Sequence, residues 1–413
     1  MPGLRVSGYT GKRVLERVER LAREGLDVAT FLSEAGAALE RAVPSGTEST
    51  PGPSWGTLDP ASLLVTSLVY EGCEISLEAW AQFEYSSGMA CNRIGDVVRN
   101  PRGVQTAREL VEADPDGGRE YLDLLASIGV AHEVLVDLRT RSGEHWGAFY
   151  LVREPGRPDF SAGELDFLRL VAPHLADGVR TGLLLGEASE PEGPDAPAIV
   201  VLGADLTPES FTPGAQHWLT DLSTPEQGEM PPAVLSVAQV ALNQRAGRGE
   251  PASVRVLSPR RGWVMLHGQT LASSWGRRVA VTLQPAGPNR ITPLLMAAYG
   301  LTQREEQVTR HVLQGASTAQ IAQALCVSPH TVQQHLKHIF EKTSVRSRRE
   351  LVSRVFSRHY QLRVEDNDER VRIDKAIRGG PFPDRRQRSR RLMASPHRRG
   401  GGWPELGDST GIG

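Results

Sequence analysis

Three side chains suited to reading base pairs lie on one segment near the C-terminal end, SPHTVQQHLKHIFEK at residues 328–342. Gln333 and Gln334 each carry a carboxamide, which can bind the adenine edge through two hydrogen bonds, and Lys337 carries an ammonium group that suits guanine. The major groove exposes these edges and admits an α-helix. The three residues are therefore our candidates for direct reading of a DNA sequence.

Five further residues suit contacts with phosphate. The imidazoles of His330 and His338, the hydroxyl of Thr331 and the guanidinium groups of Arg346 and Arg348 are donors of the kind that hold a DNA backbone. Backbone N–H groups at the start of a helix add to them, because a helix N-terminus attracts anions.

The helix that must position these groups has a clear beginning. Ser328 is a good N-cap because its hydroxyl can accept an orphan backbone N–H, and Pro329 suits the first helical position. An apolar stripe follows, formed by Val332, Leu336, Ile339 and Phe340. Taken alone, the segment fits an ordinary amphipathic surface helix equally well, so its neighbours must decide.

Capping boxes mark the neighbouring helices. The pairs are Thr302 with Glu305, Ser317 with Gln320, and Ser347 with Glu350. Together with Ser328 they predict four helices, at about 302–314, 318–325, 329–343 and 348–359. A three-residue joint between the second and third is typical of a helix-turn-helix. The residues expected to hold its helices together are Ile321, Ala322, Leu325, Val327, Val332, Leu336 and Ile339.

This unit resembles the LuxR/GerE-type DNA-binding domain along its whole length. The resemblance rests on Leu301, Thr302, Arg304, Glu305, Val308, Gly315, Ile321, Ala322, Leu325, Ser328, Thr331, Val332, His335, Lys342, Val345, Arg348, Leu351 and Val352. Cys326 stands where many helix-turn-helix proteins have glycine, and Gln333 where the family often has lysine. The resemblance implies a transcriptional regulator that binds double-stranded DNA, with RNA polymerase as a further partner. Because so small a unit reads only a half-site, we expect a homodimer.

Charge separates the two ends of the 413-residue chain. From residue 301 onward there are 21 Lys and Arg against 12 Asp and Glu, whereas the preceding part has 26 against 37. A basic end on an acidic body predicts a polyanionic partner for that end only. There is no apolar run of about 18 residues, no signal-peptide core and no CxxC pair. We therefore expect a cytoplasmic protein that has no membrane partner.

Upstream of residue 290, strand and helix signals alternate. Residues 11–43 read as helical, with a break near Gly25, and 44–57 as a loop. Strands are predicted at 62–70, more weakly at 80–87, and most clearly at 131–138 and 146–153, which form a hairpin. Two polar helices lie between 105 and 128, and a capping box at Ser161 and Glu164 opens a long helix. A second block has strands at 196–202, 252–258, 262–271 and 277–285, a short helix at 212–222 and a helix at 233–246.

The first block resembles a GAF-type sensor domain, through the hairpin AHEVLVDL/WGAFYLVR and the helix FSAGELDFLRLVAPHLADG; the second resembles, more weakly, a PAS-type unit. The expected fold is multidomain: an α+β GAF/PAS-like sensor region, then an all-α four-helix LuxR-type helix-turn-helix domain and a disordered tail. The predicted parts are an N-terminal helix and loop (1–57), a GAF-like domain (58–186), a linker (187–196), a PAS-like domain (197–287), the DNA-binding domain (294–360) and a basic tail (361–413). The tail is either an auxiliary phosphate-binding arm or an extension without a function.

Aromatic side chains in the first block suggest an effector pocket. Trp80, Phe83, Tyr85, Trp146, Phe149 and Tyr150 could line it. Ordinary packing is the competing interpretation, because Trp146, Ala148 and Tyr150 share one predicted strand face and Phe149 points to the other. Cys73 and Cys91 as a redox pair is a weaker alternative.

Catalytic motifs are missing from the sequence. There is no Walker A loop, HExxH or GxSxG. A phospho-receiver domain would require an active-site lysine, and no lysine lies between Lys12 and Lys337. We therefore expect no enzyme activity, catalytic residue, metal or cofactor. Two other hypotheses stay open: a small-molecule or redox sensor that acts through protein interactions, with a vestigial helix-turn-helix, and a GAF-fold enzyme.

Overall fold

A computed structural model describes most of the chain. The described residues are 8–48, 50, 52–69, 76–85, 91–185, 198–223, 230–244, 252–260, 262–271, 276–286, 296, 299–353 and 372. Within them, no helix is long and apolar enough to cross a membrane. The predicted linker, Cys73 and nearly all of the predicted tail lie outside the described residues.

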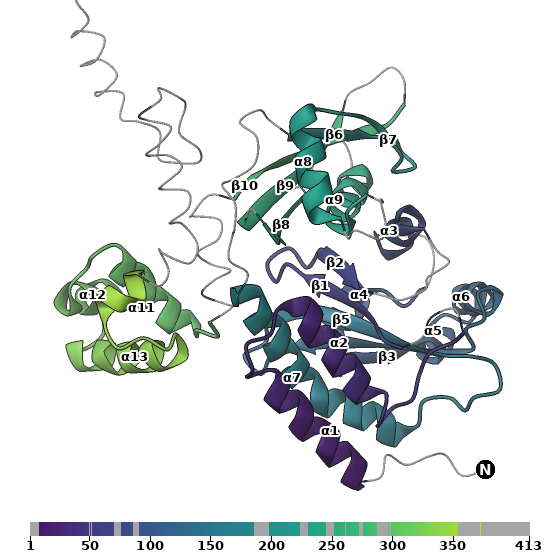
Figure 1. Cartoon of the computed structure of the whole chain (residues 1–413), viewed down its shortest axis with the longest axis horizontal. Coiled ribbons are helices and arrows are strands. Elements are labelled where there is room, and N and C mark those ends of the chain that lie inside the picture. The colour runs from purple at the N-terminus through teal and green to yellow at the C-terminus, as the bar shows by residue number, and fades with distance from the viewer. Residues whose placement is uncertain are drawn as a thin grey trace, which may run out of the picture.

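A five-stranded antiparallel sheet forms the first α+β unit (Figure 1). Its order is β2 (Val65–Val69), β1 (Ser54–Leu58), β5 (His145–Arg153), β4 (His132–Arg139) and β3 (Val104–Thr106). On one face α7 (Ala162–Leu185) packs on β4 and β5, and α1 (Gly8–Leu21) and α2 (Val28–Leu39) pack on α7. On the other face lies α4 (Ile94–Arg99), with α3 (Leu77–Tyr85), α5 (Ala107–Ala113) and α6 (Pro115–Ser127) around it. The predicted helices, hairpin and break near Gly25 are confirmed.

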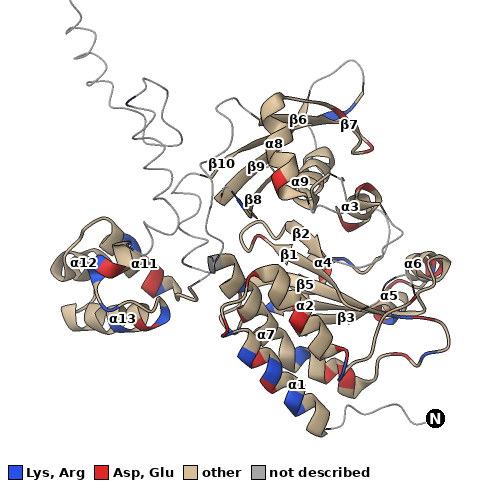
Figure 2. Cartoon of the chain, viewed as in Figure 1, with Lys and Arg blue, Asp and Glu red and all other residues tan. Residues whose placement is uncertain are grey.

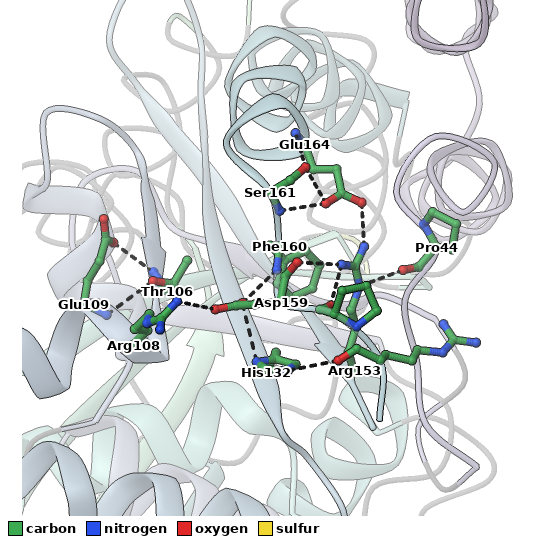
Figure 3. A network of polar contacts seen from close by, with 12 residues as sticks. Pro44, Thr106, Arg108, Glu109, His132, Arg153, Asp159, Phe160, Ser161 and Glu164 are labelled. Atoms are coloured by element: carbon green, nitrogen blue, oxygen red, sulfur yellow. Dashed lines mark hydrogen bonds and ion pairs between the residues drawn. The ribbon is translucent and has the colours of Figure 1, made fainter. Parts of the chain in front are cut away.

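The predicted capping box at the start of α7 is part of a buried polar network (Figure 3). Glu164 accepts hydrogen bonds from the backbone N–H and hydroxyl of Ser161, both at 2.8 Å, and pairs with Arg153 at 2.6 Å. Arg153 also donates to the carbonyl of Pro44 at 3.0 Å. Since both charged side chains are almost fully buried, the pair fixes the start of α7 against β5 and against the chain after α2.

The second α+β unit has its own five-stranded antiparallel sheet. The order is β7 (Pro208–Phe211), β6 (Ala198–Leu202), β10 (Arg278–Pro285), β9 (Gly262–Leu271) and β8 (Ala252–Ser258), with α8 (Pro213–Leu222) against β6. α9 (Pro232–Asn243) is buried along almost its whole surface. It packs on β8, β9 and β10 on one side and on α3 and β2 of the first unit on the other, which explains its apolar sequence.

Polar contacts join the two units, and the contact between Asp59 and Arg255 is buried. The carboxylate of Asp59, in the β1–β2 turn, accepts from the backbone N–H and the Nε of Arg255 on β8, at 3.0 and 3.1 Å. The Tyr85 hydroxyl at the end of α3 donates to the hydroxyl of Ser236 on α9 at 3.0 Å. The carbonyl of Tyr85 accepts from the side-chain amide of Asn243.

Two of the predicted elements in the first unit are wrong. Residues 80–87 were expected as a strand because they are aromatic, but α3 occupies Leu77–Tyr85 and buries Leu77, Ala81 and Glu84, at helical spacing. Residues 44–57 were expected as a loop, yet Ser54 begins β1, which lies between β2 and β5. Trp55 and Thr57 favour a strand, but the segment is only five residues long and contains a glycine, so its sequence signal is weak and pairing on both edges stabilises it.

Trp146 lies on the opposite sheet face from the predicted one. It packs with Phe149 in the core under α7, whereas Ala148 and Tyr150 face α4. The pairing of β4 with β5 shifts register between Leu138 and Arg139, which pair with Gly147 and His145, so Trp146 is the extra residue of a bulge. A bulge reverses the alternation of side chains along a strand.

Candidate nucleic-acid interface and a buried cavity

The C-terminal unit contains α11 (Gln303–Leu313), α12 (Thr318–Leu325) and α13 (Pro329–Lys342). The predicted boxes at the starts of α11 and α12 have both reciprocal hydrogen bonds. Residues 348–353 are helical as well, and the rest of the predicted fourth helix lies outside the described residues. The expected starts of the three complete helices are confirmed.

The joint between α12 and α13 depends on a left-handed residue. Cys326 has φ 53° and ψ 46°, the conformation in which glycine is most often found at a helix end. The N–H of Val327 then reaches back to the carbonyl of Ala322 at 3.0 Å. Ser328 caps the next helix by accepting from the N–H of Thr331 at 3.0 Å. These bonds fix the direction in which α13 leaves the turn.

One face of α13 is buried and the opposite face is exposed. Val332, Leu336 and Ile339 are fully buried against α11 and α12, and Phe340 is half-buried. Ile321 and Ala322 are buried as well, whereas Leu325 and Val327 are half-buried against the same core. Because α13 is held by its buried face, the side chains on its other face are not needed for packing.

The three base-reading candidates lie together on the exposed face. Gln333 donates to the Thr318 hydroxyl at 3.4 Å, Gln334 contacts the ring of His330 at 3.2 Å, and the ammonium group of Lys337 lies 4.0 Å from Glu341. The side chain of Lys337 is 76% exposed. Such surface contacts contribute little to the free energy of folding, so these side chains can leave them to form hydrogen bonds with base edges.

The phosphate candidates differ in their freedom to move. His330 and Arg346 are exposed, and the His338 side chain is 59% exposed. The hydroxyl of Thr331 contacts that of Ser328 at 2.8 Å. Arg348 is half-buried, and its guanidinium donates to the carbonyl of Ala316 and to the Thr318 hydroxyl, both at 2.8 Å. A phosphate contact by Arg348 would therefore involve the N-terminus of α12.

Charges of both signs lie on the helices of this unit (Figure 2). Residues 300–353 contain seven Lys and Arg against four Glu. Glu305 pairs with Lys342 at 2.7 Å, and Arg304 donates to the side chain of Gln307 at 2.9 Å. This pairing ties the last turn of α13 to the first turn of α11.

A cavity of about 170 Å³ lies in the first α+β unit, between the sheet face that carries Tyr150 and helices α3 and α6. Trp80, Phe83 and Tyr150 line it, as does Tyr121, which the sequence reasoning missed. Trp146 and Phe149 lie in the core under α7 instead, and Tyr85 points its hydroxyl at α9. Two buried carboxyl groups, those of Glu84 and Glu133, also lie in the cavity wall, and no pattern in the sequence indicates them.

Burial changes the acid–base chemistry of this wall. It raises the pKa of Glu84 and of Glu133 to about 7, although hydrogen bonds to each carboxylate oppose the shift. Burial also raises the pKa of the Cys91 thiol to about 11, which leaves it protonated at neutral pH. No group of three or more His, Cys, Asp or Glu in the described residues could hold a metal ion.

Comparison with known proteins identifies the C-terminal unit. Residues 300–355 match the family described as "Bacterial regulatory proteins, luxR family", so this segment carries a LuxR-type helix-turn-helix DNA-binding domain. The chain is 46% identical over 56 residues to the monoamine regulon transcriptional regulator of Klebsiella aerogenes. That stretch is 14% of this chain and about a quarter (25%) of the relative's length.

Three solved structures show weaker likeness. The phage VqmA–DPO complex covers 40% of this chain and 84% of its own, at 19% identity and a TM-score of 0.17. The match with Escherichia coli SdiA covers 84% of this chain and 96% of SdiA, at 13% identity and a TM-score of 0.27. The match with the E. coli DhaR(N)–DhaL complex covers 69% of this chain and 92% of the matched chain, at 13% identity and a TM-score of 0.21. With TM-scores below 0.5, we transfer no ligand or partner from them.

Proposed function

We propose that this chain is a sequence-specific, DNA-binding transcriptional regulator that acts in the cytoplasm. The observation that carries the proposal is α13, which follows a tight joint and is packed along one face. Its other face exposes Gln333, Gln334 and Lys337 in a segment that matches a family of bacterial regulators. A helix of this form can enter the major groove with its polar face toward the bases.

In the proposed complex, base contacts and phosphate contacts have separate roles. Gln333, Gln334 and Lys337 read base edges. His330, Thr331, His338, Arg346 and Arg348 hold the backbone and set the register of α13. A homodimer would place two such helices one DNA turn apart, and RNA polymerase is the expected partner at the promoter.

The two α+β units are proposed to be the GAF-like and PAS-like sensor domains that control this output. The sheets, each flanked by helices, and the cavity in the first unit support this role. Regulation then requires that a change in the first unit reach the DNA-binding helices, and the contacts between α3 and α9 offer a first step.

A DNA titration of the intact chain tests the function. Binding sites would be selected from a random-sequence DNA library, and the dissociation constant measured for the selected site and for scrambled DNA at several salt concentrations. Lys337→Ala should lower the discrimination between the two by roughly 1–3 kcal/mol, and Lys12→Ala, an exposed lysine on α1, is the matched control. Failure to enrich any sequence, or an affinity independent of salt, would overturn the proposal.

A further inference from the structure

The polar groups around the cavity are arranged to receive a hydrogen-bond donor. Glu133 is fully buried, and its carboxylate accepts from the side-chain amide of Asn92 at 3.0 Å and from the hydroxyl of Tyr121 at 2.9 Å. The Oδ1 atom of Asn92 is also buried, with no hydrogen-bond partner among the described residues. Asn92 itself is only 3% exposed. A buried acceptor of this kind costs free energy until a donor reaches it.

The nearby charged groups do not meet this need. Glu84 accepts the backbone N–H groups of Ile94 and Gly95 at 3.1 and 3.2 Å, so it serves the start of α4. Arg93 directs its Nε at the carbonyl of Phe83, at 3.1 Å, and its Nη1 lies 3.8 Å from Asp96. Neither Lys nor Arg forms an ion pair with Glu133 in the part of the chain that the structure describes. Its negative charge, when present, lacks a compensating cation there.

Most of the remaining wall is apolar or aromatic, and Thr50, Ser54 and Cys91 also line it. Trp80 and Phe83 of α3, Tyr121 of α6 and Tyr150 of β5 surround the space. The Tyr150 hydroxyl donates to the carbonyl of Asn92 at 3.1 Å, so it offers no donor to an occupant. A volume of about 170 Å³ is close to that of an engineered apolar cavity that takes benzene. Aromatic faces also attract a cation.

We propose that this cavity binds a small molecule that joins a ring-sized apolar body to a protonated nitrogen, and that Glu133 and Asn92 hold the nitrogen. An ammonium or amidinium group satisfies the free oxygen of Asn92 and supplies the missing positive charge at Glu133. A carboxylate or phosphate group is disfavoured at this end of the cavity, because it would face the Glu133 carboxyl and an unpaired acceptor.

Helix α3 connects this cavity to the second unit. Its Trp80, Phe83 and Glu84 face the cavity. Its Gln82 donates to the carbonyl of Asp205 at 3.1 Å, and its Tyr85 bonds Ser236 on α9. An occupant that shifts Trp80 and Phe83 therefore moves the residues that contact the second unit. This regulatory step rests on the proposed function, whereas ligand binding itself can be measured without DNA.

Matched pairs of probes test the proposal on the full chain. Benzylamine and benzamidine carry the cation, and benzyl alcohol and benzamide are neutral counterparts of similar size. We expect the cationic member to bind at least about tenfold more tightly by calorimetry at about pH 8, because only it pairs with an ionised Glu133. Glu133→Gln should remove that preference, and Glu120→Gln, the same change on the exposed side of α6, should preserve it.

The pH dependence of the unmodified chain provides a second measurement if Glu133→Gln does not fold. Affinity for benzylamine should rise at least about tenfold between about pH 5.5 and 8, while that for benzyl alcohol stays level, because Glu133 must lose its proton to bind a cation. The facing groups that titrate or carry charge are Tyr121, Tyr150, Glu84, Cys91 and Arg93. Equal binding of charged and neutral probes would overturn the proposal. The proposal would also be overturned if neither cation bound and native mass spectrometry found no cationic small molecule on the purified protein.

Discussion

The ammonium group of Lys342 lies 2.7 Å from Oε2 of Glu305 and 2.8 Å from the carbonyl of Gly300. The contact joins the last turn of α13 to the start of α11, where Glu305 also closes the capping box with Thr302. One carboxylate therefore holds a helix start and the far end of the proposed recognition helix. The sequence separation of 37 residues makes this a long-range constraint on how α13 is presented.

Acid should weaken this constraint. Burial by itself raises the pKa of Glu305, but the bonds from Lys342 and Thr302 outweigh it and hold the pKa below its ordinary value of 4.5. A lowered folded-state pKa gives stability that is present above pH 4.5 and is lost as pH falls through the folded-state value. We expect the helical unit to unfold at lower urea concentrations below pH 4.5, and circular dichroism would measure this unfolding. Glu305→Gln should reduce that acid dependence, and Glu341→Gln, at a side chain of α13 that is 61% exposed, should leave it intact.

Relief of backbone strain at the joint should stabilise the unit. Cys326 adopts a left-handed conformation that costs a side-chain-bearing residue about 1–2 kcal/mol, partly offset by the chain entropy that glycine loses on folding. Cys326→Gly should therefore raise the free energy of unfolding by roughly 0.5–1 kcal/mol. The converse change, Gly315→Ala at φ 81° with open space around it, should lower it by about 1 kcal/mol. Urea titrations in which both variants change stability in the same direction would contradict this account.

How well the sequence predicted the structure depended on how local the determining interactions are. Caps and helical stripes act over three to eight residues, so Ser328, Thr302 and Ser317 correctly marked helix starts. The β1 strand pairs with β2 after a short turn and with β5 far along the chain, and its five residues, one of them glycine, are too few to show a clear strand pattern. The bulge at Trp146 likewise arises from the register between two strands.

The candidate sites show the same division. The exposed face of α13 follows from its own periodicity, and Gln333, Gln334 and Lys337 lie on it together. The cavity residues Glu84, Asn92, Tyr121 and Glu133 come from four separate segments, and an isolated Glu in a sequence gives no sign that it will be buried. A partial signal did exist for Glu133, because it is the one charged residue among the first five positions of a strand that is otherwise mostly apolar, His132–Arg139.

The first α+β unit should lose stability as pH rises. Burial holds the pKa of Glu133 and Glu84 at about 7, above the ordinary 4.5. A raised folded-state pKa for an acid gives stability that is complete below pH 4.5 and is lost as pH rises through about 7. Between about pH 5.5 and 8 the loss should be on the order of 2 kcal/mol per group. Urea midpoints of the full chain would measure it, and Glu133→Gln should shrink the difference. A midpoint unchanged between these pH values would refute the burial argument.

Arg348 should affect stability as well as DNA binding. Its guanidinium donates to the Ala316 carbonyl and the Thr318 hydroxyl, so Arg348→Ala should lower the free energy of unfolding by about 1–2 kcal/mol. If Arg348 also contacts phosphate, the slope of log affinity against log salt should fall by about one. Arg346→Ala, at an exposed position, should change the slope without the loss of stability. A stability loss for Arg348→Ala with an unchanged salt slope would assign it to the scaffold alone.

Breaking the Asp59–Arg255 pair should separate the behaviour of the two α+β units. Their side chains are only 3% and 8% exposed, so removing one partner takes away the buried counter-ion that the other has in this pair. Asp59→Asn should therefore cost about 3 kcal/mol, whereas Glu209→Gln, which breaks a more exposed pair with Arg278, should cost less than about 1 kcal/mol. The double change Asp59→Leu with Arg255→Met should recover most of the loss, because no lone charge remains. Calorimetry would reveal whether one transition becomes two. Strictly additive effects of the single changes would contradict the coupling and leave α3 as the principal link between the units.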